Sequence, residues 1–264
     1  MKLLYPFAKR FIAGYNFETA SVSIDNLIQN GYGVTIDYVG EMSKTKSDVL
    51  KAYKEYEKIL TKYNNIDISV KPSQFGLLFN KPYCYDMLNS INQLACYTSN
   101  TVRLDMEDSR VTDDTIEIAV KYQIGCAIQA NHPDTLSNMH TLIKNNIPIR
   151  LVKGAYKEKI SHIYDVRKYF LKYANMPSNK ESITIATHDE IILDKLLHHN
   201  NYEFLYGIRR DVQEKYKNDG KQVTIYVPYG ENWMPYTLRR LKEWKNLKFV
   251  IGNIIKERLN NFML

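Results

Sequence analysis

The last part of the chain carries side chains that are well suited to binding a small carboxylate. Tyr226 lies at the end of an apolar segment, and a second segment that begins near Pro235 contains Tyr236, Arg239 and Arg240. Proline suits the first turn of a helix, and on a helix Tyr236 shares a face with at least one of the two arginines. A guanidinium can donate two hydrogen bonds to a carboxylate while an aromatic ring covers an apolar body. Taken alone, the pattern is also typical of an ordinary basic surface helix.

The elements that must position these side chains are short apolar segments, most of which leave room for a helix before the next one. We expect strands at residues 33–37, 66–70, 101–105, 126–129, 147–152, 184–187, 203–206 and 223–227. This alternation predicts an α/β fold, a closed parallel (β/α)8 TIM barrel, with the arginine-bearing helix last and over its C-terminal face. An open doubly wound sheet is the alternative, and it is disfavoured because no GxGxxG motif follows the first strand.

Polar or aromatic residues follow nearly every predicted strand. In a barrel of this kind, the active site forms at the C-terminal strand ends and in the loops after them. The residues at these ends are Asp37, Glu41, Lys71, Asp105, Gln129, Lys153, His188, Asp189, Tyr206 and Tyr226. Such a series is difficult to explain by packing alone, so we predict a functional site at this rim.

Composition sets the limits of the other expectations. The chain has 264 residues, of which 44% are hydrophobic, and this suits one domain over residues 1–264. The three cysteines form no CxxC pair and the histidines no HxH or HExxH motif, so we expect a reducing compartment and no metal site. We expect a cytoplasmic protein without a signal peptide or transmembrane segment. The net charge of +7 permits contact with the anionic inner membrane surface, and we predict no nucleic-acid partner.

Several motifs at the predicted strand ends carry a family resemblance. They lie at residues 37–41 (Asp-Tyr-Val-Gly-Glu), 102–109, 150–158, 186–189, 226–230 and 239–243. In this order and spacing they resemble the proline dehydrogenases, flavin-dependent barrel enzymes that oxidise L-proline to Δ1-pyrroline-5-carboxylate. The resemblance extends from Arg10 to Glu243 and so covers most of the chain.

The resemblance implies a set of substrate residues. They are Glu41, Lys71, Asp105, Tyr226, Tyr236, Arg239, Arg240 and Glu243. The two arginines would bind the proline carboxylate, and the two tyrosines would flank the pyrrolidine ring. Lys71 would sit beside the carboxylate, held by Asp105 or Asp37, and Glu41 would pair with Arg240 as a lid that excludes water.

The resemblance also implies FAD as the cofactor, a hydride acceptor for proline C5. Its residues would be Gln129, Arg150, Val152, Gly154, Thr187, His188 and Asp189. Gln129 would hydrogen-bond the isoalloxazine ring, and Arg150 would reach its N5 edge, where a cation stabilises the anionic reduced form. The last three would serve the pyrophosphate and ribose. A membrane quinone would accept the electrons, and a pyrroline-5-carboxylate dehydrogenase is a possible partner.

The chain departs from the family pattern at three positions. Between Phe204 and Leu205 it lacks a Gln-Met pair, Asn131 stands where the family tends to have an aromatic residue, and Lys157 stands where some members have tryptophan. An alternative therefore stays open: a weakened barrel that binds another cyclic imino acid, or a protein partner, without turnover. The retained carboxylate-binding residues favour the enzyme.

Overall fold

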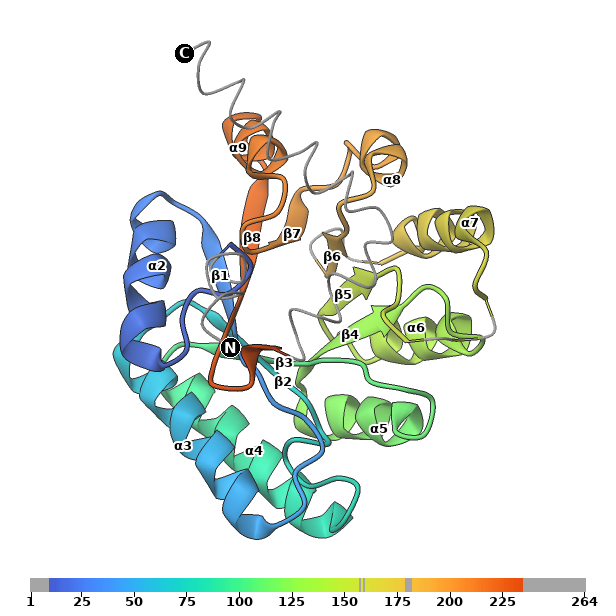
Figure 1. The fold of residues 1–264 in the computed structure, drawn as a ribbon. Helices are drawn as coiled ribbons and strands as arrows, with labels where there is room; N and C mark the ends of the chain where they lie inside the picture. Colours follow the sequence, from blue (N-terminus) through green and yellow to red (C-terminus); the bar gives the residue numbers. More distant parts are fainter. Residues whose placement is uncertain (1–9, 157, 159, 179–181, 235–264) are drawn as a thin grey trace.

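The strands of the chain close into a barrel in sequence order. The computed structural model describes residues 10–156, 158, 160–178 and 182–234, and in it each strand pairs in parallel with the next and β8 with β1 (Figure 1). The strands are β1 (Gly33–Tyr38), β2 (Asp67–Val70), β3 (Thr101–Leu104), β4 (Gly125–Gln129), β5 (Ile149–Val152), β6 (Ile183–Ala186), β7 (Asn201–Leu205) and β8 (Gln222–Tyr229). The predicted parallel barrel is confirmed.

Strand β8 is longer than the sequence predicts. We expected it to end at Val227, but it continues through Pro228 and Tyr229 because β1 stays paired with it as far as Tyr38. Val39 then donates a backbone hydrogen bond of 2.8 Å to the Tyr229 carbonyl. The two strands thereby deliver the loop after β1 to the same rim as the end of β8.

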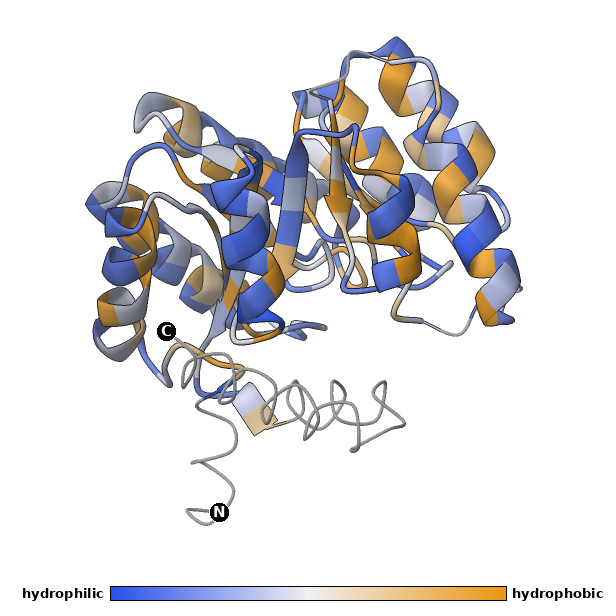
Figure 2. Ribbon diagram, turned by 90° about the horizontal axis from the view of Figure 1, so that it is seen from above, coloured by the Kyte–Doolittle hydropathy of each residue, from blue (hydrophilic) through white to orange (hydrophobic). Residues whose placement is uncertain are grey.

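Helices surround the barrel (Figure 1). They are α2 (Phe17–Gln29), α3 (Lys46–Lys62), α4 (Lys81–Tyr97), α5 (Thr112–Tyr122), α6 (Thr135–Lys144), α7 (Ile163–Ala174), α8 (Glu190–Lys195) and α9 (Arg210–Asn218). Asn16 and Thr45 form capping boxes at the starts of α2 and α3, which satisfy backbone N–H groups that have no partner within the helix. Apolar and hydrophilic residues alternate along each helix, as expected when one face is buried (Figure 2).

The two faces of the barrel wall differ in chemistry. Side chains alternate along each strand, and one set, such as Ile36, Ile68 and Leu104, is fully buried between the strands and the helices. The other set points into the barrel, where branched apolar residues usually dominate. Here many of these inner positions are polar or charged, and they provide the floor of a site.

The expected final helix and its residues Tyr236, Arg239, Arg240 and Glu243 lie outside the described residues. The single-domain assignment of residues 1–264 also stays a prediction. None of the helices that the structure describes combines the length and the apolar character needed to cross a membrane.

Candidate functional site

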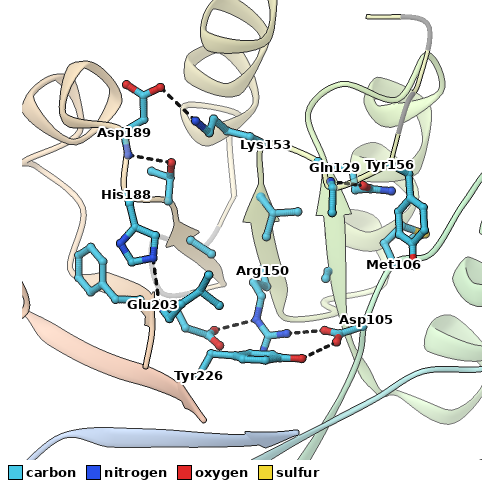
Figure 3. Close-up of a pocket in the computed structure, with 18 of the residues that line it drawn as sticks. Asp105, Met106, Gln129, Arg150, Lys153, Tyr156, His188, Asp189, Glu203 and Tyr226 are labelled. Carbon is cyan, nitrogen blue, oxygen red and sulfur yellow. Dashed lines mark hydrogen bonds and ion pairs between the residues drawn. The ribbon is translucent and has the colours of Figure 1, made fainter. Parts of the chain in front are cut away.

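A pocket of about 590 Å³ opens at the C-terminal ends of the strands (Figure 3). Its size falls within the range of small-ligand sites. Ten of the residues predicted from the sequence line it: Lys71, Asp105, Gln129, Arg150, Val152, Gly154, Thr187, His188, Asp189 and Tyr226. Glu41 is not among the lining residues; it lies exposed in the loop after β1.

Arg150 is the centre of a buried charge network. From β5, its Nε donates to Glu203 on β7 at 2.7 Å, and its Nη1 donates to Asp105 at 2.8 Å and to the Ser69 hydroxyl at 3.0 Å. The guanidinium also lies 5.1 Å from the ring centre of Tyr226 (Figure 3). Burial disfavours the charge, but Glu203 and Asp105 outweigh burial and hold the pKa of Arg150 above its usual value.

The network keeps unused hydrogen-bonding capacity. Arg150 Nη2 and Glu203 Oε1 are buried and have no hydrogen-bond partner among the residues that the structure describes. Buried polar groups in folded proteins are nearly always paired. Because both residues line the pocket, these atoms are suited to a bound molecule.

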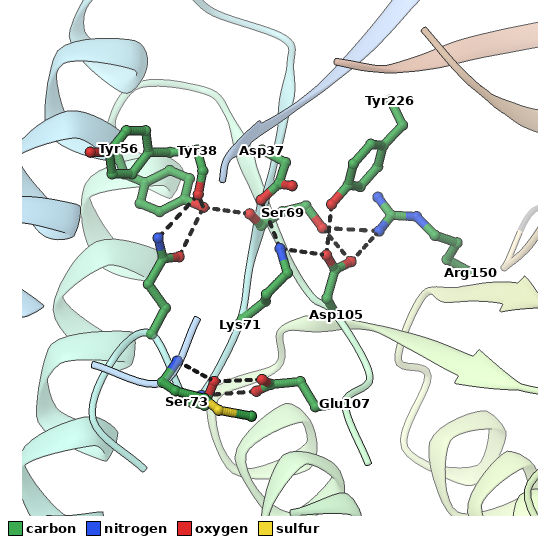
Figure 4. A network of polar contacts seen from close by, with 12 residues as sticks. Asp37, Tyr38, Tyr56, Ser69, Lys71, Ser73, Asp105, Glu107, Arg150 and Tyr226 are labelled. Carbon is green, nitrogen blue, oxygen red and sulfur yellow. Dashed lines mark hydrogen bonds and ion pairs between the residues drawn. The ribbon is translucent and has the colours of Figure 1, made fainter. Parts of the chain in front are cut away.

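Lys71 lies between two carboxylates, those of Asp37 and Asp105. The resemblance implied that one of these two would hold it. Its Nζ is 2.9 Å from Asp37 Oδ1 and 3.3 Å from Asp105 Oδ2, and the Tyr226 hydroxyl donates to Asp105 at 2.7 Å (Figure 4). Burial alone would lower the pKa of Lys71, but the two carboxylates raise it. For the fully buried Asp37 the balance is the reverse: burial outweighs Lys71 and raises the pKa of the carboxyl. The site therefore holds a charged lysine.

The pKa of Asp105 makes a testable contribution to acid stability. Burial opposes ionisation, but Lys71 and Arg150 lower the pKa to about 2, below the usual value of about 3.9. Ionised Asp105 therefore stabilises the fold above about pH 4, and this contribution is lost as the pH falls through about 2. Urea unfolding should show that Asp105→Asn costs more stability at pH 5 than at pH 2.5. An equal cost at both values would contradict this assignment.

His188 makes a structural contact as well as lining the pocket. Its Nε2 accepts a hydrogen bond of 3.1 Å from the Leu205 backbone N–H (Figure 3). The pairing of β6 with β7 ends at Ala186 and Glu203, so His188 supplies an acceptor where β7 has passed the end of its neighbour. The imidazole lines the pocket and also holds the end of β7.

One end of the pocket holds two cations, Lys153 and Arg167. Lys153 and Arg167 both contact Asp189 Oδ2, at 3.2 Å and 2.9 Å. Although burial acts against ionisation, these two cations lower the pKa of Asp189. The Asp189 backbone N–H in turn donates to the Thr187 hydroxyl at 3.2 Å. Two cations share one carboxylate here, which leaves positive charge for an anionic group.

Gln129 and Gly154 are fixed by the loops around them. Gln129 Nε2 donates to the Glu107 carbonyl at 2.9 Å, and its Oε1 accepts from the Ala155 N–H at 3.0 Å. Gly154 has φ +119°, and a Cβ there would lie 1.9 Å from Asn131 Oδ1. Asn131, one of the departures noted above, thus requires a glycine at position 154 and also donates to the Tyr156 carbonyl at 2.9 Å.

The lining residues fit a flavin. Ala127, Val152 and Ala186 are small apolar residues on β4, β5 and β6, and they leave a space for a flat ring system beside Arg150. The free Nη2 of Arg150 can donate to a ring atom, and the cations at one end of the pocket suit a diphosphate. Within the described part of the chain, no group of three or more histidine, cysteine or acidic side chains could hold a metal ion.

Sequence reasoning missed several residues of the site. They are Ser69, which accepts from Arg150, and Arg167, Glu203 and Leu205, which line the pocket. Glu203 could have been found, because it is two residues before Leu205 in a predicted strand and so points to the same face as other inner residues. A charged residue at such a position needs a buried partner, and that partner is Arg150.

The sequence is similar to those of two proline dehydrogenases over nearly its whole length. The chain is 28% identical to proline dehydrogenase 1 of Bacillus subtilis over 278 residues, 95% of this chain and 91% of the relative. It is 26% identical to a proline dehydrogenase of Deinococcus radiodurans over 295 residues, 96% of this chain and 91% of the relative.

A solved structure of proline utilization A (PutA) from Bdellovibrio bacteriovorus, inactivated by N-propargylglycine, has the same fold. It aligns with a TM-score of 0.83 at 20% identity, over 93% of this chain, which spans 33% of the PutA chain. The family model for proline dehydrogenase matches residues 20–166, more than half of the sequence and all of the strands from β1 to β5. The chain therefore belongs to the proline dehydrogenase family.

Proposed function

We propose that this protein is a flavoenzyme of proline catabolism that oxidises L-proline to Δ1-pyrroline-5-carboxylate. Family membership supports proline oxidation in general. The observation that carries the proposal is that ten residues implied for substrate and cofactor, from separate strand ends, line one pocket. Three of them belong to the substrate set and seven to the cofactor set.

The substrate would be held at the end of the pocket that contains Lys71. The charged ammonium of Lys71 attracts a carboxylate, while Asp37 and Asp105 fix its position. Tyr226 is oriented by its hydrogen bond to Asp105 and would contact the pyrrolidine ring. Tyr236, Arg239, Arg240 and Glu243 complete the proposed set outside the described residues, and Glu41 would close over the bound substrate by pairing with Arg240.

The cofactor would be FAD, held by Gln129, Arg150, Val152, Gly154, Thr187, His188 and Asp189. Bound FAD would supply a hydride acceptor for proline C5, and a quinone-type acceptor would take up the electrons. Within the protein, Asp105 and Glu203 keep the Arg150 guanidinium protonated, so it presents a positive charge. The protein mainly positions the reactants, which can lower a barrier by about 7–11 kcal/mol at most.

The proposed setting is cytoplasmic. A membrane quinone is the proposed electron acceptor, which would bring the protein to the inner membrane surface as a peripheral protein. A pyrroline-5-carboxylate dehydrogenase would consume the product. The alternative is a barrel that binds another cyclic imino acid, or a protein partner, without turnover. The Gln-Met pair that is missing between Phe204 and Leu205 favours it.

Anaerobic titration of the FAD-loaded protein with L-proline tests the proposal. We expect loss of the oxidised-flavin absorbance at about 450 nm, because hydride transfer reduces the flavin. L-valine, which has no ring, is the control and should cause no loss. Bound flavin that L-proline does not bleach would contradict the proposal. A rise in melting temperature with proline in that case would support binding without turnover.

A further inference from the structure

We propose that Ser73 and Glu107 are positioning residues that hold the Glu41 loop, residues 39–45, at the rim of the pocket. Neither residue lines the pocket. Both are buried, with 1% and 4% of their surface exposed. The inference rests on the proposed function, in which the Glu41 loop covers bound proline, and it assigns two residues that act through that loop.

Ser73 and Glu107 form a tight pair between the ends of β2 and β3. The Ser73 hydroxyl donates to Glu107 Oε1 at 2.5 Å, and the Ser73 backbone N–H donates to Oε2 at 2.9 Å (Figure 4). Both carboxylate oxygens are therefore used by one residue. Hydrogen bonds to a buried carboxylate are stronger than those between neutral groups, so Ser73 is fixed relative to β3.

The same serine holds the Glu41 loop by two contacts. The Met42 N–H donates to the Ser73 hydroxyl oxygen at 3.0 Å, and the Ser43 N–H donates to the Ser73 carbonyl at 3.1 Å. Met42 has φ +56°, in the left-handed region that disfavours residues other than glycine. Such a conformation persists when surrounding contacts require it. These contacts fall on the two residues directly after Glu41.

The path continues to the other side of the pocket. Glu107 accepts at its backbone carbonyl from Gln129 Nε2, and Gln129 Oε1 accepts from the Ala155 N–H. A continuous series of hydrogen bonds therefore joins Met42, Ser73, Glu107, Gln129 and Ala155. It links the loop proposed to cover the substrate with the loop proposed to contact the flavin, across the ends of the five strands from β1 to β5.

Removing one oxygen atom tests the inference. In Ser73→Ala, Met42 loses its acceptor while the backbone contact to Ser43 remains. We expect KM for proline to rise about three- to tenfold, the size of one or two lost hydrogen bonds, with kcat changed less than about twofold. Flavin content should not change. A general loss of stability would not produce this separation of KM from kcat.

A double-mutant cycle shows whether Ser73 acts through Glu41. In a Glu41→Gln background, the lid interaction is already lost, so Ser73→Ala should change KM by less than about 1.5-fold. An undiminished effect in that background would overturn the inference. Thr98→Val is the matched control, because Thr98 donates and accepts hydrogen bonds in the same way at the end of α4. It should leave KM unchanged.

Hydrogen exchange separates a failure of this inference from a failure of the proposed function. In Ser73→Ala, the amides of Met42 and Ser43 should exchange at least about tenfold faster, since the loop opens more often. Thr98→Val should not alter them. If the wild-type protein does not oxidise proline, the proposed function fails, and faster exchange still supports the anchoring of the loop. Unchanged exchange in Ser73→Ala would overturn it.

Discussion

Arg150→Met is expected to lower the free energy of unfolding by about 3–5 kcal/mol and to abolish flavin reduction by proline. The side chain volume is largely kept, but Asp105 and Glu203 lose the cation that they share. Removing one partner of a buried ion pair is costly because an uncompensated charge stays behind. Urea unfolding and anaerobic titration with proline would measure the two effects.

A compensating change and a distant control make the Arg150 prediction specific. Arg150→Met/Glu203→Gln should recover part of the stability, because one buried charge is removed, but it should not recover flavin reduction. Arg103→Met is the control, since Arg103 forms a similar pair with Asp67 inside the barrel but does not line the pocket. It should cost stability and leave flavin reduction intact. A double variant that reduces flavin normally would show that Arg150 is structural only.

The strand order could be predicted because each strand carries its own signal. Most outward residues of β1, β2 and β3 are β-branched or leucine, and the helices between them begin at residues such as Thr45 that cap a helix well. The conformational preferences of these segments therefore agree with their places in the barrel. The predicted end of β8 was wrong. Proline usually ends a strand, but pairing with β1 continues this strand past Pro228.

The partners within the site could not be predicted in the same way. Glu203 is 53 residues from Arg150, and the pair forms only because both side chains point into the barrel from β5 and β7, which lie on either side of β6. Gln129 was expected to face the flavin, yet both ends of its amide hold neighbouring loops. The type of side chain at a strand end can be read from sequence, but its contacts depend on register and shear.

Lys71→Met is expected to cost about 3 kcal/mol or more of stability at pH 7, with a characteristic dependence on pH. Without the Lys71 ammonium, the fully buried Asp37 loses its counter-charge. Burial then raises the pKa of its carboxyl further. A group with a raised pKa in the folded state costs nothing when it is protonated in both states. The stability that the variant loses relative to the wild type should thus be small below about pH 4. It should grow as the pH rises toward the pKa of Asp37 in the folded variant.

A second variant separates the structural role of Lys71 from its proposed role in binding. Lys71→Met/Asp37→Asn removes both charges of the closer pair, so most of the stability loss and its pH dependence should disappear. Proline binding should not return, because the cation proposed to face the substrate carboxylate is still missing. Chemical unfolding from pH 4 to 8 and flavin titration with proline measure the two properties. If the double variant were stable and bound proline normally, Lys71 would serve only to neutralise Asp37, and Arg239 and Arg240 would have to bind the carboxylate without it.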